Sequence, residues 1–303
     1  MPKRYLITGV TSFLGSNLAK KLLADGYTVY GVVRPQSKNL RVAESIGGLE
    51  LVKADFDDFE YENELYDHLA KLGVFDIYSW IHFSWDGIGS VGRSNPDIQQ
   101  INLKNAQKAF KTAEKMNVKR FVFSGSQAEY GTGSKESPEP VSPYGQYKYK
   151  FYEWASNQDS GMEYVHMRIY STYGPGDHPT SLVNTCIRTF LEDKEMVMGA
   201  CTHIWNYMDI RDCTRAISLL STREEKTEGV FEIASSTCKP LKDYVMDIHR
   251  ICGFKGECLF GQRADNAEGA VDLIADLTRL KGIGFEEDYT FEEGIRNIIN
   301  SCY

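Results

Sequence analysis

Short apolar runs alternate with amphipathic segments along the first half of the chain. These runs predict strands at residues 4–8, 27–33, 49–54, 75–83, 121–124 and 164–169. Helical patterns lie between them: one carries Leu14, Leu18 and Leu22 on one face, and the others span residues 95–115 and 144–157. Strands separated by helices in this way predict βαβ units and therefore a parallel sheet.

The segments after residue 169 are shorter and more mixed. Residues 170–179, with the sequence YSTYGPGDHP, are dense in glycine and proline and mark a change in organisation. Beyond them we expect helices at 181–193, 212–222, 240–252 and 290–300, and strands at 204–210 and 230–235. The whole pattern predicts an α/β fold: a doubly wound parallel sheet over 1–173, a return strand near 229–236, and a smaller, discontinuous part within 174–303.

Composition narrows the class of protein. The chain has 303 residues, 42% of them hydrophobic, and a net charge of −8, which disfavours binding to nucleic acid or to an anionic membrane. No apolar stretch has the length of a signal peptide or a membrane span. The seven cysteines are scattered without CxxC spacing, so we expect no metal site, no disulfide framework and a cytoplasmic location.

The first predicted strand leads into the turn Gly9-Val-Thr-Ser-Phe-Leu-Gly15 and then into a helix. Strand, glycine turn and helix in this order favour a dinucleotide site, because a helix amino terminus offers free N–H groups and a partial positive charge to the pyrophosphate. We expect Gly9 to permit the tight turn and Gly15 to permit close packing of helix on strand. Ser12 occupies the middle position, where glycine is preferred.

The ends of the next predicted strands indicate which dinucleotide binds. Arg34 stands where an acidic residue would hold the ribose hydroxyls of NAD, so it favours a 2′-phosphate and NADP(H), with Ser37 and Lys38 as further donors. The alternative is a solvated loop arginine. At the third strand end, the Asp55 carboxylate can accept from the adenine amino group. The glycine-rich residues 87–92 are expected to form a mobile loop over a pocket.

The stretch from Phe121 to Lys150 contains the candidate catalytic groups. Ser126 follows a predicted strand, so it should lie at the carboxyl edge of the sheet, where ligands of open α/β sheets bind. Tyr144 and Lys148 are four residues apart and share one face of a helix. An ammonium near a phenol favours the phenolate over a reference pKa of about 10. The three groups therefore suit proton transfer to or from a carbinol while a hydride moves elsewhere.

Taken together, these motifs resemble the extended short-chain dehydrogenase/reductase family, and within it the nucleotide-sugar epimerases, dehydratases and ketoreductases. ITGVTSFLGSNL resembles the family's TGxxGxxG opening, and SGSQAEYG its strand end before Tyr-Gly; Tyr144 to Lys148 form the YxxxK element, and RIYSTYGPGD and IRDCTRAI match later segments. The resemblance implies a Rossmann domain that binds the dinucleotide and a carboxy-terminal part that binds the nucleotide sugar. It also implies a homodimer formed through helices 95–116 and 144–158.

Carried over by position, the resemblance assigns roles to individual residues. Tyr144 would donate or accept the proton, Ser126 would orient the substrate oxygen, and Lys148 would bind the nicotinamide ribose. The expected cofactor-binding residues are Gly9, Thr11, Ser12, Phe13, Leu14, Gly15, Arg34, Ser37, Lys38, Asp55, Phe56, Phe83, Ser84, Trp85, Ser124, Tyr144, Lys148 and Tyr170. The expected substrate-binding residues are Asp86, Ser126, Gln127, Asn184, Trp205 and Arg263.

Departures from the family pattern narrow the reaction. Sugar 4,6-dehydratases carry an Asp-Glu pair where this chain has Gln127 and Ala128, neither of which can act as a general acid. Glu129 and the tryptophans of SWDG and IWNY are similar to those of reductases of 4-keto-6-deoxy sugars, such as abequose-type synthases. Trp205 replaces an arginine that many relatives place near the nucleotide, with Arg263 as a candidate substitute.

These features lead to one main hypothesis and two alternatives. The main hypothesis is NADPH-dependent reduction of the keto group, at C4, of a nucleotide-activated 4-keto-6-deoxy sugar. The first alternative is a C4 or C3/C5 epimerase that uses the same residues with a retained NAD(P). The second is a dinucleotide-binding sensor without chemistry. His178 and Cys186 are either an additional acid/base pair or, as we favour, a loop residue and a helix-face filler.

Overall fold

The computed structural model of the chain describes residues 3–58, 60–263 and 274–303. The chain forms two compact units. The first contains Met1–Arg168 and Thr214–Phe231, and the second contains Ile169–Cys213 and Glu232–Tyr303. The assignment of a cofactor-binding part to residues 1–173 and a substrate-binding part to 174–303 stays a prediction.

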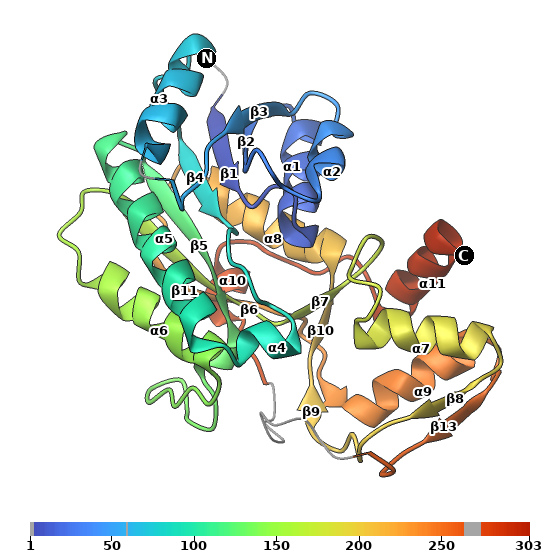
Figure 1. Ribbon diagram of the computed structural model, residues 1–303. Helices are drawn as coiled ribbons and strands as arrows, with labels where there is room; N and C mark the ends of the chain where they lie inside the picture. Colours follow the sequence, from blue (N-terminus) through green and yellow to red (C-terminus); the bar gives the residue numbers. More distant parts are fainter. Residues whose placement is uncertain (1–2, 59, 264–273) are drawn as a thin grey trace. The chain divides into compact units, whose positions relative to one another are not determined.

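A seven-stranded sheet forms the centre of the first unit and confirms the predicted doubly wound α/β fold (Figure 1). Its strand order is β11-β6-β5-β4-β1-β2-β3, and β1 pairs in parallel with both β2 and β4. The strands are β1 Arg4–Thr8, β2 Thr28–Val33, β3 Glu50–Lys53, β4 Ser79–His82, β5 Arg120–Ser126, β6 Glu163–Ile169 and β11 Gly229–Ile233. The order reverses at β1, so the carboxyl ends of β1 and β4 border a topological switch point, where ligands of such sheets bind.

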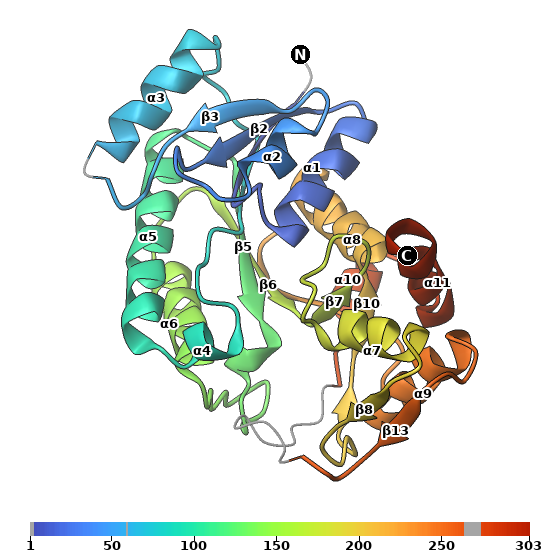
Figure 2. The ribbon, with the colours of Figure 1, turned by 45° about the vertical axis from the view of Figure 1, so that its right-hand side comes forward.

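Helices cover both faces of this sheet. Figures 1 and 2 show α5 and α6 on one face and α1 and α8 on the other. The helices of the first unit are α1 Phe13–Ala24, α2 Leu40–Glu44, α3 Tyr61–Lys71, α4 Ser90–Arg93, α5 Pro96–Lys115, the 3-10 turn η1 Gln127–Glu129 and α6 Pro143–Ser156; α8 Ile210–Thr222 begins in the second unit. Apolar side chains of α3, α5 and α6 pack on Leu6, Trp80 and Phe121 of the strands and bury one continuous core.

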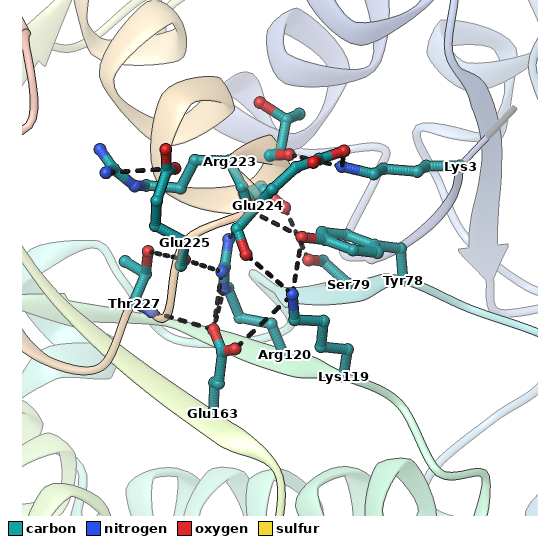
Figure 3. Close-up of polar contacts among 12 residues, drawn as sticks. Lys3, Tyr78, Ser79, Lys119, Arg120, Glu163, Arg223, Glu224, Glu225 and Thr227 are labelled. Atoms are coloured by element: carbon teal, nitrogen blue, oxygen red, sulfur yellow. Dashed lines mark hydrogen bonds and ion pairs between the residues drawn. The ribbon is translucent and has the colours of Figure 1, made fainter.

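The carboxyl terminus of α8 is held by side chains at the beginnings of the strands (Figure 3). The guanidinium of Arg120 donates to the carbonyl oxygens of Leu220 at 2.7 Å, Arg223 at 3.1 Å and Glu225 at 3.0 Å. It also donates to the carboxylate of Glu163 at 2.6 and 2.8 Å. Because the last carbonyls of a helix lack intrahelical partners, this Arg120–Glu163 cluster caps α8 and fixes it to the sheet.

The second unit consists of short strand pairs and helices. Its elements are β7 Ser171–Tyr173, α7 Leu182–Leu191, β8 Glu195–Val197, β9 Ile204–Trp205, β10 Tyr207–Asp209, β12 Lys239–Pro240, α9 Leu241–Ile251, β13 Glu257–Leu259, α10 Thr278–Gly282 and α11 Phe291–Cys302. The apolar faces of α7, α9 and α11 meet in one core, with Phe190, Ile248 and Ile295 among its buried side chains. No helix among the described residues is long and apolar enough to cross a bilayer.

Several sequence-based boundaries need correction. The fourth strand was expected from Phe75 but begins at Ser79, since Phe75 is 78% exposed and takes no part in the sheet. Residues 87–92, expected to be a loop, contain part of the short helix α4. The predicted strand at 204–210 is two short strands, β9 and β10, joined at Asn206. The small pair β8–β13 carries no strong period-2 pattern and was missed.

Candidate active site

The β1–α1 turn has the backbone geometry expected of a phosphate site. Gly9 has φ +73°, and a Cβ there would lie 2.7 Å from the carbonyl carbon of Phe83. A Cβ on Gly15 would collide with the carbonyl oxygen of Gly9. Only glycine therefore fits at either position. The Ser12 hydroxyl accepts from the Gly15 N–H at 3.1 Å and caps α1, which explains why serine replaces glycine in the middle of the motif.

The polar groups at the ends of β2 and β3 contact protein partners. Arg34, whose side chain is 47% exposed, donates to the Asp86 carboxylate at 3.1 Å. Thus a predicted cofactor residue and a predicted substrate residue bind each other. The Asp55 carboxylate accepts from the Gln36 amide at 2.7 Å, and the Phe56 ring packs against that of His82. Ser37 lies in the turn after Arg34, and Lys38 is exposed.

Ser126 and Tyr144 are brought to the same edge of the sheet. Ser126 is the last residue of β5, is 5% exposed, and accepts from the Ala128 N–H at 3.2 Å. Tyr144 lies in the first turn of α6, which begins with the Ser142 cap and Pro143. A Cβ on the adjacent Gly145 would collide with the Ala128 carbonyl oxygen. Glycine at 145 therefore allows the start of α6 to pack directly on the turn after Ser126.

Lys148 is a buried ammonium one helical turn from Tyr144. It is 2% exposed, its Nζ donates to the Ser124 carbonyl oxygen, and it lies 4.3 Å from the centre of the Trp85 ring. Burial lowers the pKa of Lys148 to about 7; the charge of Glu129 opposes this effect and that of Arg93 adds to it. Such a strongly shifted lysine beside a serine and a tyrosine is typical of an active site.

A second cation, not predicted from the sequence, lies beside the phenol. The Arg93 guanidinium, from α4, stacks 4.4 Å from the centre of the Tyr144 ring. Trp85 contacts the same ring edge-on, at 6.5 Å between centroids, and its indole N–H donates to the Gln99 amide at 2.6 Å. Arg93 directly follows residues 87–92, which were expected to be a loop, and nothing in its local sequence indicates that it would reach a residue about fifty positions later.

Glu129 is the other group whose environment was not foreseen. It is 0% exposed, and its carboxylate accepts from the imidazole of His166 at 2.9 Å and the guanidinium of Arg168 at 3.0 Å. It also accepts the Ser126 backbone N–H at 2.8 Å. Burial alone would raise the pKa of the Glu129 carboxyl, but these partners outweigh burial and hold the pKa below its usual range. We refer to these side chains as the Glu129–His166–Arg168 cluster.

Four further candidates, Tyr170, Asn184, Trp205 and Arg263, lie in the second unit. The Tyr170 phenol donates to Glu232 at 2.9 Å, and the Asn184 amide donates to the Asp177 and His178 carbonyl oxygens at 3.2 and 3.1 Å. The indole nitrogen of Trp205 is buried and has no hydrogen-bond partner among the described residues. Arg263 is exposed, with its backbone N–H bonded to Met198. Their predicted roles in binding stay predictions.

His178 and Cys186 do not have the properties of an additional acid/base pair. The imidazole of His178 is exposed and contacts the Thr180 hydroxyl at 2.8 Å. Cys186 is fully buried, and burial raises the pKa of its thiol far above the neutral range. Within residues 3–58, 60–263 and 274–303, no three His, Cys, Asp or Glu side chains gather as metal ligands would.

Proteins similar to this chain include some named as enzymes of nucleotide sugars. The chain is 23% identical to a putative UDP-glucose 4-epimerase of Methanocaldococcus jannaschii over 97% of both chains. The crystal structure of the Thermotoga maritima UDP-glucose 4-epimerase with UDP-glucose superposes with a TM-score of 0.85 at 22% identity, over 98% of each chain. That of the Thermus thermophilus UDP-glucose 4-epimerase with NAD gives 0.81 at 19% identity, again over 98% of each chain.

The comparison with protein families gives the assignment. The model of the NAD dependent epimerase/dehydratase family matches residues 5–234. This range runs from β1 to the end of β11 and includes the glycine turn, Ser126, Tyr144 and Lys148. The chain is therefore an enzyme of the NAD dependent epimerase/dehydratase family, in the extended short-chain dehydrogenase/reductase group that its motifs predicted.

Proposed function

We propose that this enzyme is a nucleotide-sugar epimerase that inverts a hydroxyl-bearing carbon, C4, of a nucleoside diphosphate hexose. The observation that carries the proposal is a Ser126, Tyr144 and Lys148 set with no acid next to it at Gln127 or Ala128. Inversion by oxidation and re-reduction of one carbon needs a single group that takes a proton and returns it. Tyr144 supplies that group.

The cofactor requirement fits the residues present. Gly9 and Gly15 let the turn between β1 and α1 pack closely on backbone atoms of Phe83 and Gly9, and the amino terminus of α1 opens onto this turn. A nicotinamide dinucleotide held there would supply a hydride acceptor and donor for C4. We propose NAD as this dinucleotide, because the family is named for it and the Thermus relative was crystallised with it.

The chain's own residues account for the proton. In the forward step the C4 hydroxyl O–H and the C4–H bonds break, the proton passes to the Tyr144 phenolate, and a C4 ketone forms. Ser126 donates a hydrogen bond to the reacting oxygen, while Lys148 and Arg93 favour the phenolate by their positive charges. After the ketone presents its other face, the C4–H bond re-forms and Tyr144 returns its proton to the oxygen.

Dehydration is disfavoured by the environment of the nearest carboxylate. Elimination of water from a sugar needs a further acid/base pair beside the tyrosine. Gln127 and Ala128 have no such group, and the Glu129 carboxylate is 0% exposed and bound to His166 and Arg168. A carboxylate held in that way is not available to a substrate.

The NADPH-dependent reductase of the main sequence hypothesis is the second candidate. Arg34 at the end of β2 favours it, since a guanidinium suits a 2′-phosphate and this one is 47% exposed despite its ion pair with Asp86. The relatives described above carry the name of 4-epimerases, which supports the epimerase instead.

One experiment separates these candidates. One sample of the purified protein is denatured, and any released dinucleotide is identified by chromatography. A second, native sample is incubated with UDP-hexoses in D₂O, and the sugars are followed by ¹H NMR. An epimerase retains NAD, forms the C4 epimer without net change in nicotinamide absorbance, and takes up no deuterium at C4. Stoichiometric consumption of added NADPH with a 4-keto sugar would instead establish the reductase, and neither reaction with any sugar would favour a sensor.

A further inference from the structure

Buried charged side chains bind the turn that carries Ser126. Ser126 and Glu129 form a reciprocal capping box: the Glu129 carboxylate accepts the Ser126 N–H at 2.8 Å, and the Ser126 hydroxyl accepts the Ala128 N–H at 3.2 Å. The position of the serine hydroxyl therefore depends on where the Glu129 carboxylate lies. That carboxylate does not face solvent, since its side chain is 0% exposed.

Two basic residues of β6 fix this carboxylate. His166 contacts both Glu129 oxygens at 2.9 Å, and Arg168 donates to one of them at 3.0 Å. The other imidazole nitrogen of His166 lies 2.7 Å from the Tyr164 hydroxyl. Burial raises the pKa of Tyr164 well above its usual range, so the phenol keeps its proton and can donate it to His166. The opposite ring nitrogen of His166 then carries the proton that points at Glu129.

The packing around Gly125 shows that the Glu129–His166–Arg168 cluster lies directly against the end of β5. A Cβ on Gly125 would lie 2.5 Å from a Glu129 carboxylate oxygen and would collide with the His166 imidazole. The Arg168 guanidinium is itself placed between rings, 4.3 Å from the centre of Tyr130 and 5.4 Å from that of Tyr152. The Glu129 carboxylate and the Arg168 guanidinium are therefore closely packed, against the Gly125 backbone and the two tyrosine rings respectively.

The same carboxylate acts on Lys148. The charged or titratable groups around that ammonium are Glu129 from η1, Arg93 from α4, His82 from β4 and Tyr144 from its own helix. Burial lowers the pKa of His82 to about 3, so His82 is neutral. Of the remaining groups, Glu129 brings the negative charge that opposes the effects of burial and of Arg93 on Lys148.

We propose that Glu129 is a positioning residue of this active site: its carboxylate, held by His166 and Arg168, fixes the turn that carries Ser126 and provides the compensating negative charge for Lys148. The proposal rests on the proposed roles of Ser126, Tyr144 and Lys148. It goes beyond them because it assigns a function to a buried cluster outside that set.

The test compares Glu129→Gln with Glu129→Asp, and uses Glu136→Gln, an exposed loop carboxylate, as the control. In Glu129→Gln the charge is lost, so we expect kcat to fall about 10- to 100-fold with the KM for the sugar little changed. The Lys148 titration midpoint, measured by NMR of ¹³C,¹⁵N-lysine-labelled protein, should move down by about one pH unit. In Glu129→Asp the charge remains but the reach is shorter, so kcat falls while the midpoint stays.

The NMR readout keeps this inference separate from the proposed function. An unchanged Lys148 midpoint in folded Glu129→Gln overturns the assignment of the compensating charge to Glu129, and an unchanged kcat overturns its role in fixing the Ser126 turn. If the wild-type protein epimerises no sugar, the epimerase proposal fails, yet the Lys148 midpoint still decides the question about Glu129. If Glu129→Gln does not fold, Arg168→Gln replaces it; removing that positive charge should raise the midpoint, and no change overturns the proposal.

Discussion

Two buried ion clusters lie at opposite ends of the same pair of strands, β5 and β6. At the beginnings of the strands, Arg120 of β5 binds Glu163 of β6 and the end of α8 (Figure 3). At their carboxyl ends, Glu129 in the turn after β5 binds His166 and Arg168 of β6. The side chains of Arg120 and Glu129 are both 0% exposed.

The difference between the clusters is in what they hold. In the Arg120–Glu163 cluster, an arginine of β5 binds backbone carbonyls and so attaches helix α8 to the sheet. In the Glu129–His166–Arg168 cluster, residues of β6 bind a carboxylate on a turn and so, in our proposal, place the Ser126 hydroxyl. Buried ion pairs of similar chemistry thus serve the scaffold at one edge of the sheet and, in our proposal, the reaction at the other.

The largest effect is expected on turnover, from a change at the carboxyl edge of the sheet where Ser126 and Tyr144 lie. In Tyr144→Phe the proposed proton carrier is lost, and we expect kcat to fall by about 10³-fold while the melting temperature stays near that of the wild type. Tyr147→Phe, on the same helix, is the matched control and should retain full activity. Turnover of the Tyr144 variant at the wild-type rate would remove the proposed acid/base group and with it the catalytic half of the comparison.

The next largest effect is expected on stability, from a change at the opposite edge, where β5 and β6 begin. In Arg120→Met the Glu163 carboxylate loses its buried partner and three carbonyls lose their donor, so the free energy of unfolding should fall by about 3–5 kcal/mol. Turnover per folded molecule should be unchanged at a temperature where the variant is folded. Urea unfolding measures the first quantity. Lys119→Met, at the exposed neighbour, should cost less than about 1 kcal/mol; an equal loss there would mean that burial does not distinguish the two residues.

For Lys148→Met we expect a smaller change in the free energy of unfolding than for Arg120→Met, and of opposite sign. The pKa of this lysine is about 7 in the folded protein against 10.5 for an exposed lysine. Between these values the unfolded chain holds the proton and the folded chain does not, so stability rises with pH over this window. Lys148→Met should remove that rise and stabilise the protein at pH 7 by roughly 0.5–2 kcal/mol while abolishing turnover. Thermal unfolding against pH, with exposed Lys150→Met as control, tests this; a destabilised variant would contradict it.

The smallest effect is expected for Arg34. Its ion pair with Asp86 is exposed, so Arg34→Ala should change the free energy of unfolding by less than about 1 kcal/mol. If Arg34 recognises a 2′-phosphate, the variant loses affinity for NADPH but not for NADH in a fluorescence titration, and Arg41→Ala loses neither. An unchanged ratio of the two affinities would remove the argument for NADP(H) and leave NAD as proposed.

Local patterns in the sequence were sufficient for the framework of the first unit. The run Arg4–Thr8, the glycines at 9 and 15 and the apolar face of α1 each depend on neighbours within a few residues, and the structure has them as predicted. The same holds for α5, whose Asn95 cap and Pro96 are start signals of a helix. The fourth strand was predicted too long because Phe75 and Ile77 are apolar although only Ile77 is buried.

Only part of the candidate site could be predicted from local sequence patterns. Ser126, Tyr144 and Lys148 were found because two of them are four residues apart and the third ends a strand, which are properties of local geometry. Arg93 over the Tyr144 ring and His166 against Glu129 were not found, since they lie about fifty and thirty-seven positions from their partners. A solvated charge and a buried one have the same letter in a sequence.

The sequence by itself therefore determined the order of strands and helices, the glycine turn between β1 and α1, the family and the YxxxK pair, because each follows from periodicity or short-range spacing. The tertiary structure alone decided which charges are buried and which groups face them. The free energy of a buried charge depends on desolvation and on partners brought together by the packing of separate strands and helices. That is why the environments of Lys148 and Glu129 became visible only in the folded chain.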